Sequence, residues 1–295
     1  MTEIAKIWPK FVLFRRKKIM DKKPELLYLD LIKKTLSFSL WPEPPLPIET
    51  FNYRNHAFKR GLISLSSRFL KRKGLELATI RHHNEGEREE GRIWPGYADT
   101  MIGLKRLDNL QSCIETVIGE GIEGDLIETG AWRGGACIFM RAVLAAYGVE
   151  DRRVFVADSF EGLPRPDKKW RADRDNTLHG HKFMAISLDE VENNFRRYGL
   201  LDDKVVFLQG WFKDTLPDAP IEKLSVLRLD GDMYGSTMDA LQNLYPKLSK
   251  GGFCIIDDYG AIEGCRKAVS DFRGQYGIET EIHEIDWTGR FWRKD

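Results

Sequence analysis

The sequence lacks the features that mark several classes of protein. Its 295 residues include only four cysteines: Cys113, Cys137, Cys254 and Cys265. These are too widely spaced for a zinc site or a disulfide framework, so we expect a reducing, cytoplasmic setting. The longest apolar runs, such as Phe11–Phe14, are far shorter than the roughly 20 residues that a membrane-spanning helix needs. An apolar signal-peptide region is also missing, because Trp8 and Pro9 interrupt the sequence early.

The chain also lacks a large net charge, which is only +1, but its charge is unevenly distributed. Residues 1–84 hold 18 basic and 7 acidic residues, a net charge of +11, and the remainder holds 28 basic and 38 acidic residues, a net charge of −10. Because aromatic interleaving and a nucleic-acid motif are missing, we expect no nucleic-acid partner. The asymmetry favours a basic arm that docks on its own acidic body, and the alternative is contact with an anionic partner.

The first 84 residues are predicted to form a basic, helical N-terminal extension. Pro24–Ser39 has helical spacing of leucine and isoleucine, and Phe58–Phe69 fits a second amphipathic helix. Between them, Trp41–Pro47 is rich in proline, and no helix is expected to cross it. His82–Glu90 is predicted to be a polar turn or linker.

Residues 85–295 form the second predicted domain, in which strand and helix patterns alternate. Strands are expected at Asp125–Thr129, Val154–Ser159, Val205–Gln209, Leu224–Asp230, Phe253–Asp258, Glu281–Asp286 and Arg290–Lys294. Helices are expected at Gly134–Tyr147, Leu188–Tyr198 with Ser187 as its cap, Ser236–Leu248 closed by Gly251 and Gly252, and Glu263–Tyr276. Short buried strands between helices predict an α/β fold with a parallel sheet covered on both faces. Ligands bind such sheets at the carboxyl ends of the strands.

The residues that follow the first two strands suggest a nucleoside-containing ligand. Glu128 to Gly135 reads E-T-G-A-W-R-G-G, which is not the dinucleotide fingerprint G-x-G-x-x-G. Gly130 permits close approach of the backbone to a ligand, and Glu128 would repel phosphate but attract an ammonium group. Asp158 ends the second strand, where its carboxylate can accept both hydroxyls of a ribose. The alternative for Asp158 is a cap for the turn that follows.

Four carboxylates follow two later strands. Asp230 and Asp232 lie in the sequence L-D-G-D-M-Y, and Asp257 and Asp258 lie in I-D-D-Y. On neighbouring strands these groups would repel one another, and a hard divalent cation such as Mg²⁺ would relieve the repulsion. The alternative is that they cap the following helices, but four of them at one edge favour a metal site.

From Tyr97 to Lys294 the chain resembles the metal-dependent O-methyltransferases of macrolide and aminocoumarin biosynthesis, the macrocin O-methyltransferase type. The resemblance covers about two thirds of the chain and rests on several motifs in the family's order. They are the segment Ala98–Gln111, the E-T-G-A-W-R-G-G turn, A-D-S-F-E-G-L-P at Ala157–Pro164, G-W-F-K-D-T-L-P at Gly210–Pro217, L-D-G-D-M-Y and I-D-D-Y.

The resemblance implies a Rossmann-like class I fold dependent on S-adenosylmethionine (SAM), with a mostly parallel seven-stranded sheet. It implies that SAM is held by Thr100, Met101, Glu128, Gly130, Ala131, Trp132, Asp158, Ser159, Gln209 and Gly210. It also implies that Mg²⁺ is held by Asp230, Asp257 and Asp258, with Asp232 as the general base.

The expected activity is methylation of a sugar hydroxyl, with a vicinal diol as the favoured acceptor. The sugar could belong to a secondary metabolite, a nucleotide sugar or a surface glycan. Arg165–Ile186 is interpreted as a mobile lid over the acceptor, in which His179 and His181 could touch substrate. We also expect a homo-oligomer, most simply a dimer. The competing functions are a nicotinamide-dependent oxidoreductase and a non-catalytic SAM-binding protein.

Overall fold

The centre of the molecule is a seven-stranded sheet. The computed structural model describes residues 23–48, 65–80 and 84–295, and everything below refers to these. In spatial order the strands are β5 (Val205–Gln209), β4 (Val154–Asp158), β3 (Asp125–Thr129), β6 (Leu224–Leu229), β7 (Leu248–Ile256), β9 (Arg290–Arg293) and β8 (His283–Glu284). The first five run parallel, β9 runs antiparallel to β7, and β8 runs antiparallel to β9. The predicted fold class is therefore confirmed.

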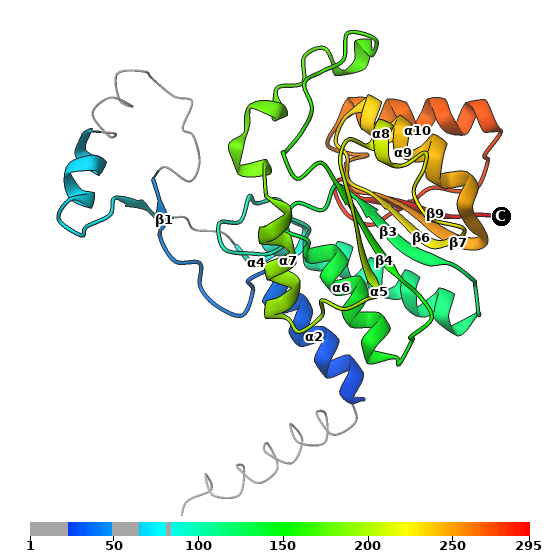
Figure 1. Ribbon diagram of the computed structural model, residues 1–295, viewed down its shortest axis with the longest axis horizontal. Helices are drawn as coiled ribbons and strands as arrows, with labels where there is room; N and C mark the ends of the chain where they lie inside the picture. The colour runs from blue at the N-terminus through cyan, green and yellow to red at the C-terminus, as the bar shows by residue number, and fades with distance from the viewer. Residues whose placement is uncertain (1–22, 49–64, 81–83) are drawn as a thin grey trace, which may run out of the picture.

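Helices cover both faces of this sheet (Figure 1). One face carries α2 (Pro24–Leu36), α5 (Leu104–Gly119), α6 (Gly135–Ala146) and α7 (Leu188–Arg197), and the other carries α9 (Tyr234–Leu244) and α10 (Glu263–Tyr276). Successive strand residues face opposite sides of the sheet. Leu126 and Val156 join the core on the side of α2, α5, α6 and α7 (the first core), whereas Ile127 and Phe155 join the core on the side of α9 and α10 (the second core). Both faces are buried, which explains the nearly continuous apolar runs of the parallel strands.

Most predicted elements are found with shifts of a few residues. Asp125–Thr129, Val205–Gln209 and Glu263–Tyr276 have the predicted bounds, and the side chain of Ser187 does cap α7. The pair Gly251–Gly252 was predicted to close a helix, and this is wrong, because both residues lie inside β7. The preceding helix ends earlier, at Leu244, and a 3-10 turn containing Pro246 follows it.

Two helices differ from the sequence-based expectations. Helix α5 is absent from the predicted elements, although its buried residues include Leu107, Leu110, Ile114 and Val117 at helical spacing. Residues of the predicted turn His82–Glu90 form the short helix α4 (Glu85–Glu89), because Asn84 and Glu87 make a reciprocal capping box.

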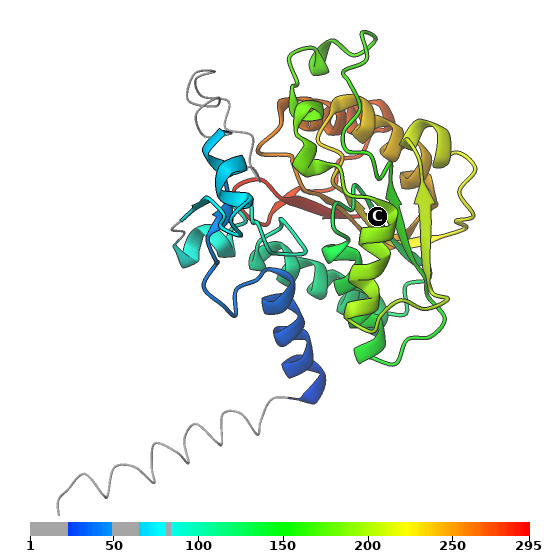
Figure 2. The same ribbon diagram turned by 60° about the vertical axis from the view of Figure 1, so that its left-hand side comes forward.

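Helix α2 belongs to the same core as the sheet. Leu29 and Leu36 are fully buried against α5 and α6, although they precede the predicted domain boundary at residue 84. The division of the chain at that residue stays a prediction. Figures 1 and 2 show the segment after α2, with the two-stranded pair β1 (Leu46–Pro47) and β2 (Ala78–Thr79), outside both helix layers.

Two expectations for the extension fall partly outside the described residues. The basic arm expected within residues 1–84 is described only at residues 23–48, 65–80 and 84, and of the helix predicted at Phe58–Phe69 only the end is described, where residues 65–71 are helical. Among the residues that the structure describes, no helix is both long enough and apolar enough to cross a membrane.

Candidate active site

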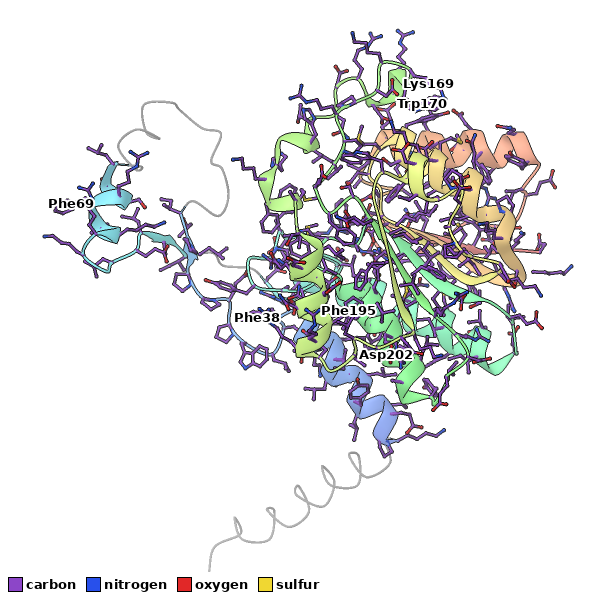
Figure 3. The ribbon with its side chains drawn as sticks, in the orientation of Figure 1. Phe38, Phe69, Lys169, Trp170, Phe195 and Asp202 are labelled. Atoms are coloured by element: carbon purple, nitrogen blue, oxygen red, sulfur yellow. The ribbon has the colours of Figure 1, made fainter. Side chains whose placement is uncertain are left out.

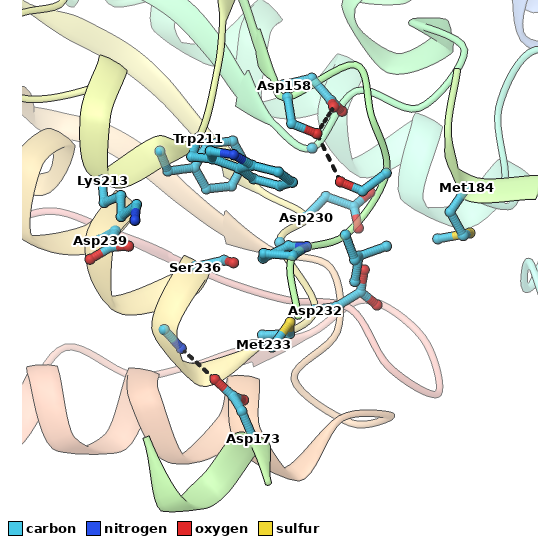
Figure 4. Close-up of a pocket in the computed structure, with 18 of the residues that line it drawn as sticks. Asp158, Asp173, Met184, Trp211, Lys213, Asp230, Asp232, Met233, Ser236 and Asp239 are labelled. Atoms are coloured by element: carbon cyan, nitrogen blue, oxygen red, sulfur yellow. Dashed lines mark hydrogen bonds between the residues drawn. The ribbon is translucent and has the colours of Figure 1, made fainter. Parts of the chain in front are cut away.

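A cavity of about 370 Å³ opens at the carboxyl ends of the parallel strands. Of the predicted site residues, it is lined by Met101, Gly130, Trp132, Asp158, Ser159, Gly210, Asp230 and Asp232. Figure 4 shows Asp158, Asp230 and Asp232 following one another across the site, with Trp211 and Lys213 on one side and Met184 on the other. The edge of the sheet that the sequence predicted to carry a site therefore holds a cavity.

The turn after β3 is held in place by a glycine and an aspartate. Gly130 has a φ of +95°, and a Cβ atom there would lie 1.7 Å from the carbonyl oxygen of Asp230. Asp158 Oδ2 accepts the backbone N–H groups of Ala131 at 2.8 Å and Trp132 at 3.3 Å. Its Oδ1 accepts the N–H of Phe160 at 2.8 Å. Burial raises the pKa of Asp158, and these amides oppose the shift.

Of the two roles considered for Asp158, the structure shows the cap, and the contact with a ribose stays a prediction. Asp158 caps both turns, and it also lines the cavity, so its carboxylate remains at the surface that a ligand would meet. A carboxylate oxygen has more than one acceptor site, which makes the two roles compatible.

Glu128 lies elsewhere than the sequence analysis expected. It does not line the cavity and is only 2% exposed. Its carboxylate pairs with Arg228, its direct neighbour in the register of β3 and β6, and accepts a hydrogen bond from the thiol of Cys137 at 2.9 Å. Glu128 and Arg228 each lie two residues beyond a side chain of the first core, so both face inward. The cation that Glu128 binds is therefore an arginine of the same chain.

Arg228 joins Glu128 to the acidic cluster. It also contacts Asp257, and its Nη1 lies 2.9 Å from Asp230 Oδ2. Burial raises the pKa of Glu128 to about 7 and that of Asp230 to about 6, while Arg228 opposes both shifts. This arginine was missed by the sequence analysis, although a charged residue inside the otherwise apolar strand L-S-V-L-R-L was a usable signal.

A second buried arginine comes from helix α5. Arg106 contacts Asp257 and places its Nε 2.9 Å from Asp286 Oδ2, in the turn between β8 and β9. Asp257 therefore lies between two guanidinium groups. Burial alone would raise the pKa of Asp257, but Arg106 and Arg228 hold it below its usual value. Because α5 was not predicted from the sequence, the role of Arg106 was not predicted either.

Asp230, Asp257 and Asp258 come together as predicted for a metal site. Each offers an oxygen, and these oxygens lie within 4.8 Å of one another. Burial and the neighbouring carboxylates, Asp232 first among them, raise the pKa of Asp258 well above its usual range. Six carboxylates face only two arginines here: Glu128, Asp230, Asp232, Asp257, Asp258 and Asp286. The excess of negative charge and the oxygen donors fit a hard divalent cation.

Asp232 lies beside this trio in a strained conformation. It has a φ of +57°, which is rare for a residue with a side chain, and its N–H donates to Asp258 Oδ2 at 3.2 Å. Its pKa is raised well above the usual range, first by burial and then by Asp230 and Asp257. Strain and a perturbed pKa at a cavity wall are typical of a functional residue.

Five further predicted residues do not line the cavity, and two of them, Asp257 and Asp258, lie next to it through their contact with Asp230. Thr100 and Ala131 are buried behind it, and Gln209 is exposed next to Gly210. Thr100 packs near the start of α6, since a Cβ atom at Gly135 would lie 2.6 Å from its Cβ.

Several lining residues were not predicted individually. They are Trp170, Asp173, Met184, Trp211, Phe212, Lys213, Met233, Ser236 and Asp239, among others. Trp170, Asp173 and Met184 belong to the predicted lid Arg165–Ile186, which does border the cavity and contains three 3-10 turns. His179 and His181 do not line it, and the ring of His181 packs against Trp94 at 5.3 Å.

Comparison with known proteins agrees with this geometry. The model of the macrocin-O-methyltransferase (TylF) family matches residues 25–294. A tetracenomycin-C rhamnosyl 4'-O-methyltransferase of Streptomyces olivaceus is 54% identical over 90% of this chain and 92% of its own length. Mycinamicin III 3''-O-methyltransferase of Micromonospora griseorubida is 48% identical over 91% and 96%. The solved structure of the O-methyltransferase NovP is 45% identical, covers 92% of this chain and 99% of its own, and superposes with a TM-score of 0.78.

The match runs through α2, the sheet and the carboxylate-lined edge alike, and the family resemblance inferred from the motifs is confirmed. The chain belongs to the macrocin-O-methyltransferase (TylF) family of SAM-dependent O-methyltransferases.

Proposed function

We propose that the protein methylates a hydroxyl of a sugar on a glycosylated natural product, with a divalent cation, Mg²⁺ first, and with Asp232 as general base. The observation that carries this proposal is the placement of Asp232 on the cavity wall, beside three carboxylates that can share one ion. Named relatives act on a rhamnosyl tetracenomycin and on mycinamicin III, which supports a glycoside as the acceptor.

The charge of the cavity favours a glycoside over a nucleotide sugar. Six aspartates line it, against the two basic residues Arg165 and Lys213: Asp158, Asp167, Asp173, Asp230, Asp232 and Asp239. A pyrophosphate would meet this negative field at short range, and one divalent cation offsets only part of it. A neutral glycoside meets no such penalty. The acceptor is therefore formed before methylation, by a reaction that joins the sugar to its carrier.

SAM would supply an electrophilic methyl group, and Met101, Gly130, Trp132, Asp158, Ser159 and Gly210 are the residues that we propose hold it. We propose that Asp158 receives the ribose hydroxyls, because it lines the cavity and its oxygens keep acceptor sites beyond the amides that they bind. Three of the predicted residues that do not line the cavity would support its lining residues instead: Thr100, Glu128 and Ala131. The N–H of Ala131 donates to Asp158, and the carboxylate of Glu128 pairs with Arg228. We propose that Gln209 contributes only through its neighbour Gly210.

Asp230, Asp257 and Asp258 would hold the cation, which would supply positive charge to lower the pKa of an acceptor hydroxyl. A carboxylate oxygen of Asp232 takes the hydroxyl proton. Burial makes Asp232 more basic than an exposed aspartate, which suits that role. Trp170 and Met184 cover the cavity from the lid and exclude water from the transfer.

The test begins with titration of the purified protein with S-adenosylhomocysteine, with NAD as the control, each with and without Mg²⁺. Binding of S-adenosylhomocysteine but not NAD is expected. Turnover is then measured with a panel of aryl glycosides bearing vicinal hydroxyls, starting with 4-nitrophenyl α-L-rhamnopyranoside. Binding of NAD alone would refute the proposal and support the oxidoreductase, and binding without any turnover would support a non-catalytic SAM-binding protein.

The role of Asp232 is tested with Asp232→Asn. Turnover is expected to fall by about 10² to 10⁴, while the affinity for S-adenosylhomocysteine changes by less than about threefold. Asp203→Asn is the matched control, because its side chain is 83% exposed and does not line the cavity. Unchanged turnover in Asp232→Asn would remove Asp232 from the role of base, and full activity in a chelator would remove the metal.

We also propose that the protein forms a homodimer through its N-terminal region. Large apolar side chains are exposed on α2 and on the segment 65–80, including Leu27, Leu31, Leu65 and Phe69. Leu27 and Leu31 lie one helical turn apart, as do Leu65 and Phe69, so each pair forms a small apolar strip of the kind that can join an interface. Light scattering coupled to size exclusion is expected to give twice the mass of 34.1 kDa, and a monomeric mass would contradict the proposal.

A further inference from the structure

The lid contains one buried acidic residue that the mechanism above does not use. Between Glu161 and Ala185, every residue other than Asp173 is at least partly exposed. Asp173 is 2% exposed and lies in a 3-10 turn, Arg171–Asp173. Burying a single carboxylate in an otherwise open loop costs free energy unless it gains strong partners.

The partners of Asp173 are the first two amides of helix α9. Its Oδ1 accepts the N–H of Tyr234 at 2.7 Å, and its Oδ2 accepts the N–H of Gly235 at 2.9 Å. Figure 4 shows one of these bonds to Asp173. The residue at the N-cap position of α9, Met233, supplies no side-chain cap. Asp173, which is 61 residues away from Tyr234 in the sequence, therefore does for α9 what a local Ser or Asp usually does.

Two glycines leave room for this contact. A Cβ atom at Gly235 would lie 2.7 Å from the ring of Trp170, and a Cβ atom at Gly264 would lie 2.9 Å from Asp173 Oδ1. Trp170 also packs on Tyr234, with 4.9 Å between the ring centroids. Figure 3 shows Trp170 and Lys169 on the lid beside the layer of α8 (Phe212–Thr215), α9 and α10. The lid therefore packs on a contact site formed by Tyr234 and Gly235 of α9 and Gly264 of α10.

This contact site adjoins the strained turn that carries Asp232. Only Met233 separates Asp232 from the first residue of α9, and Asp232, Met233 and Gly235 all line the cavity together with Trp170 and Asp173. If the lid lifts, Tyr234 and Gly235 lose the acceptor of their N–H groups, and the left-handed conformation of Asp232 loses its fixed neighbour.

We propose that Asp173 is a positioning residue that couples closure of the lid to the placement of Asp232. Asp173 touches no reacting atom in this scheme. It acts through the first turn of α9, so that the base is aligned only when the acceptor is covered. The inference rests on the proposed function, because it takes Asp232 as the base.

The first arm of the test needs no acceptor. Trypsin can cut the lid at Lys168, Lys169, Arg171 and Arg174, all of which are exposed. With S-adenosylhomocysteine bound, Asp173→Ala is expected to be cut about tenfold faster or more, typical of losing hydrogen bonds to a charged group. Asp175→Ala is the matched control, since Asp175 is exposed in the same loop. Equal cleavage of the two variants would overturn the view that Asp173 is a latch, that is, that its bonds to α9 hold the lid closed.

The second arm separates positioning from mere stabilisation. With the glycoside that gives the highest turnover in the panel above, Asp173→Ala is expected to lose about tenfold or more in kcat, with unchanged affinity for S-adenosylhomocysteine. Faster cleavage with an unchanged kcat at saturation would leave Asp173 a structural cap and overturn its role in placing Asp232. Asp173→Asn, which keeps the shape and one acceptor, serves if Asp173→Ala does not fold.

The two proposals fail differently. If no wild-type turnover is found with any glycoside, the proposed function fails, and trypsin cleavage alone then decides whether the latch exists. If wild-type turnover is found but Asp173→Ala matches Asp175→Ala in both arms, the latch fails and the proposed function stands.

Discussion

Removal of Arg228 is expected to destabilise the metal-free protein strongly. This side chain is 1% exposed and contacts three carboxylates, those of Glu128, Asp230 and Asp257. Arg228→Met keeps most of the volume but leaves those carboxylates without the guanidinium. Breaking a buried ion pair by removing one partner costs about 3–5 kcal/mol.

This magnitude converts into a measurable shift of the melting temperature. At roughly 2.1 cal/mol/K per residue, 295 residues give an unfolding entropy of about 0.6 kcal/mol/K. A loss of about 3–5 kcal/mol then lowers Tm by roughly 5–8 °C in a chelator. Because a divalent cation at the same carboxylates would replace part of the lost charge, Mg²⁺ or Mn²⁺ is expected to raise Tm more in Arg228→Met than in the wild type.

Arg141→Met is the matched control. Arg141 also pairs with an aspartate, Asp202, but the side chain of Asp202 is 37% exposed, so its loss costs about 1 kcal/mol or less. Thermal unfolding followed by circular dichroism, in EDTA and in Mg²⁺, gives the comparison. Equal Tm values for the two variants in EDTA would refute the view that Arg228 holds the acidic cluster together.

Three further outcomes are expected. Gly130→Ala should lower both the stability and the affinity for S-adenosylhomocysteine much more than Gly148→Ala does. Both glycines have a positive φ, but a Cβ atom at Gly130 would clash with Asp230, whereas nothing lies within 4 Å of the Cβ position of Gly148. Urea unfolding and ligand titration measure the two effects. Leu36→Ala should cost about 2–5 kcal/mol in urea unfolding, since Leu36 is fully buried, whereas Leu31→Ala, at a 53% exposed site, should cost far less. The pKa of Glu128 in the folded protein, about 7, exceeds its ordinary value of 4.5, so between these pH values the native state binds more protons than the unfolded state. In EDTA, the free energy of unfolding should therefore fall from pH 5 to pH 7.5. The fall should be smaller in Glu128→Gln, which lacks this titrating group.

Each of these comparisons has a result that would contradict it. Equal losses in the two glycine variants would mean that β3 and β6 can separate at the turn, and a neutral Leu36→Ala would mean that α2 is not part of the core. An equal fall in stability with pH in Glu128→Gln would assign the proton uptake to another group.

The edge of the sheet that carries the site was predictable because sequence period and strand direction suffice for it. Short apolar strands separated by helices dictate a parallel sheet, and residues after such strands share one edge. Asp158, Asp230 and Asp232 follow that rule, and all three line the cavity. Likewise the family motifs identified the enzyme class.

The direction of individual side chains was harder to predict. Glu128 was expected to face a ligand, but the alternation of β3 turns it toward the first core, where Arg228 of β6 is its neighbour. The pairing of β3 with β6 could not be read from the chain, since about 95 residues separate the two strands.

The sequence by itself determined the architecture, the glycine-rich turn after β3 and the acidic edge, because these follow from local periodicity and from what each residue type can do. Only the tertiary structure decided how the acidic charge is balanced and what holds the lid. Arg106, Arg228 and Asp173 reach their partners across 180, 100 and 61 residues of sequence. A charged residue in an apolar strand can be noticed in the sequence, as at Arg228, but its partners cannot, since such contacts form only when the sheet brings distant segments to the same place.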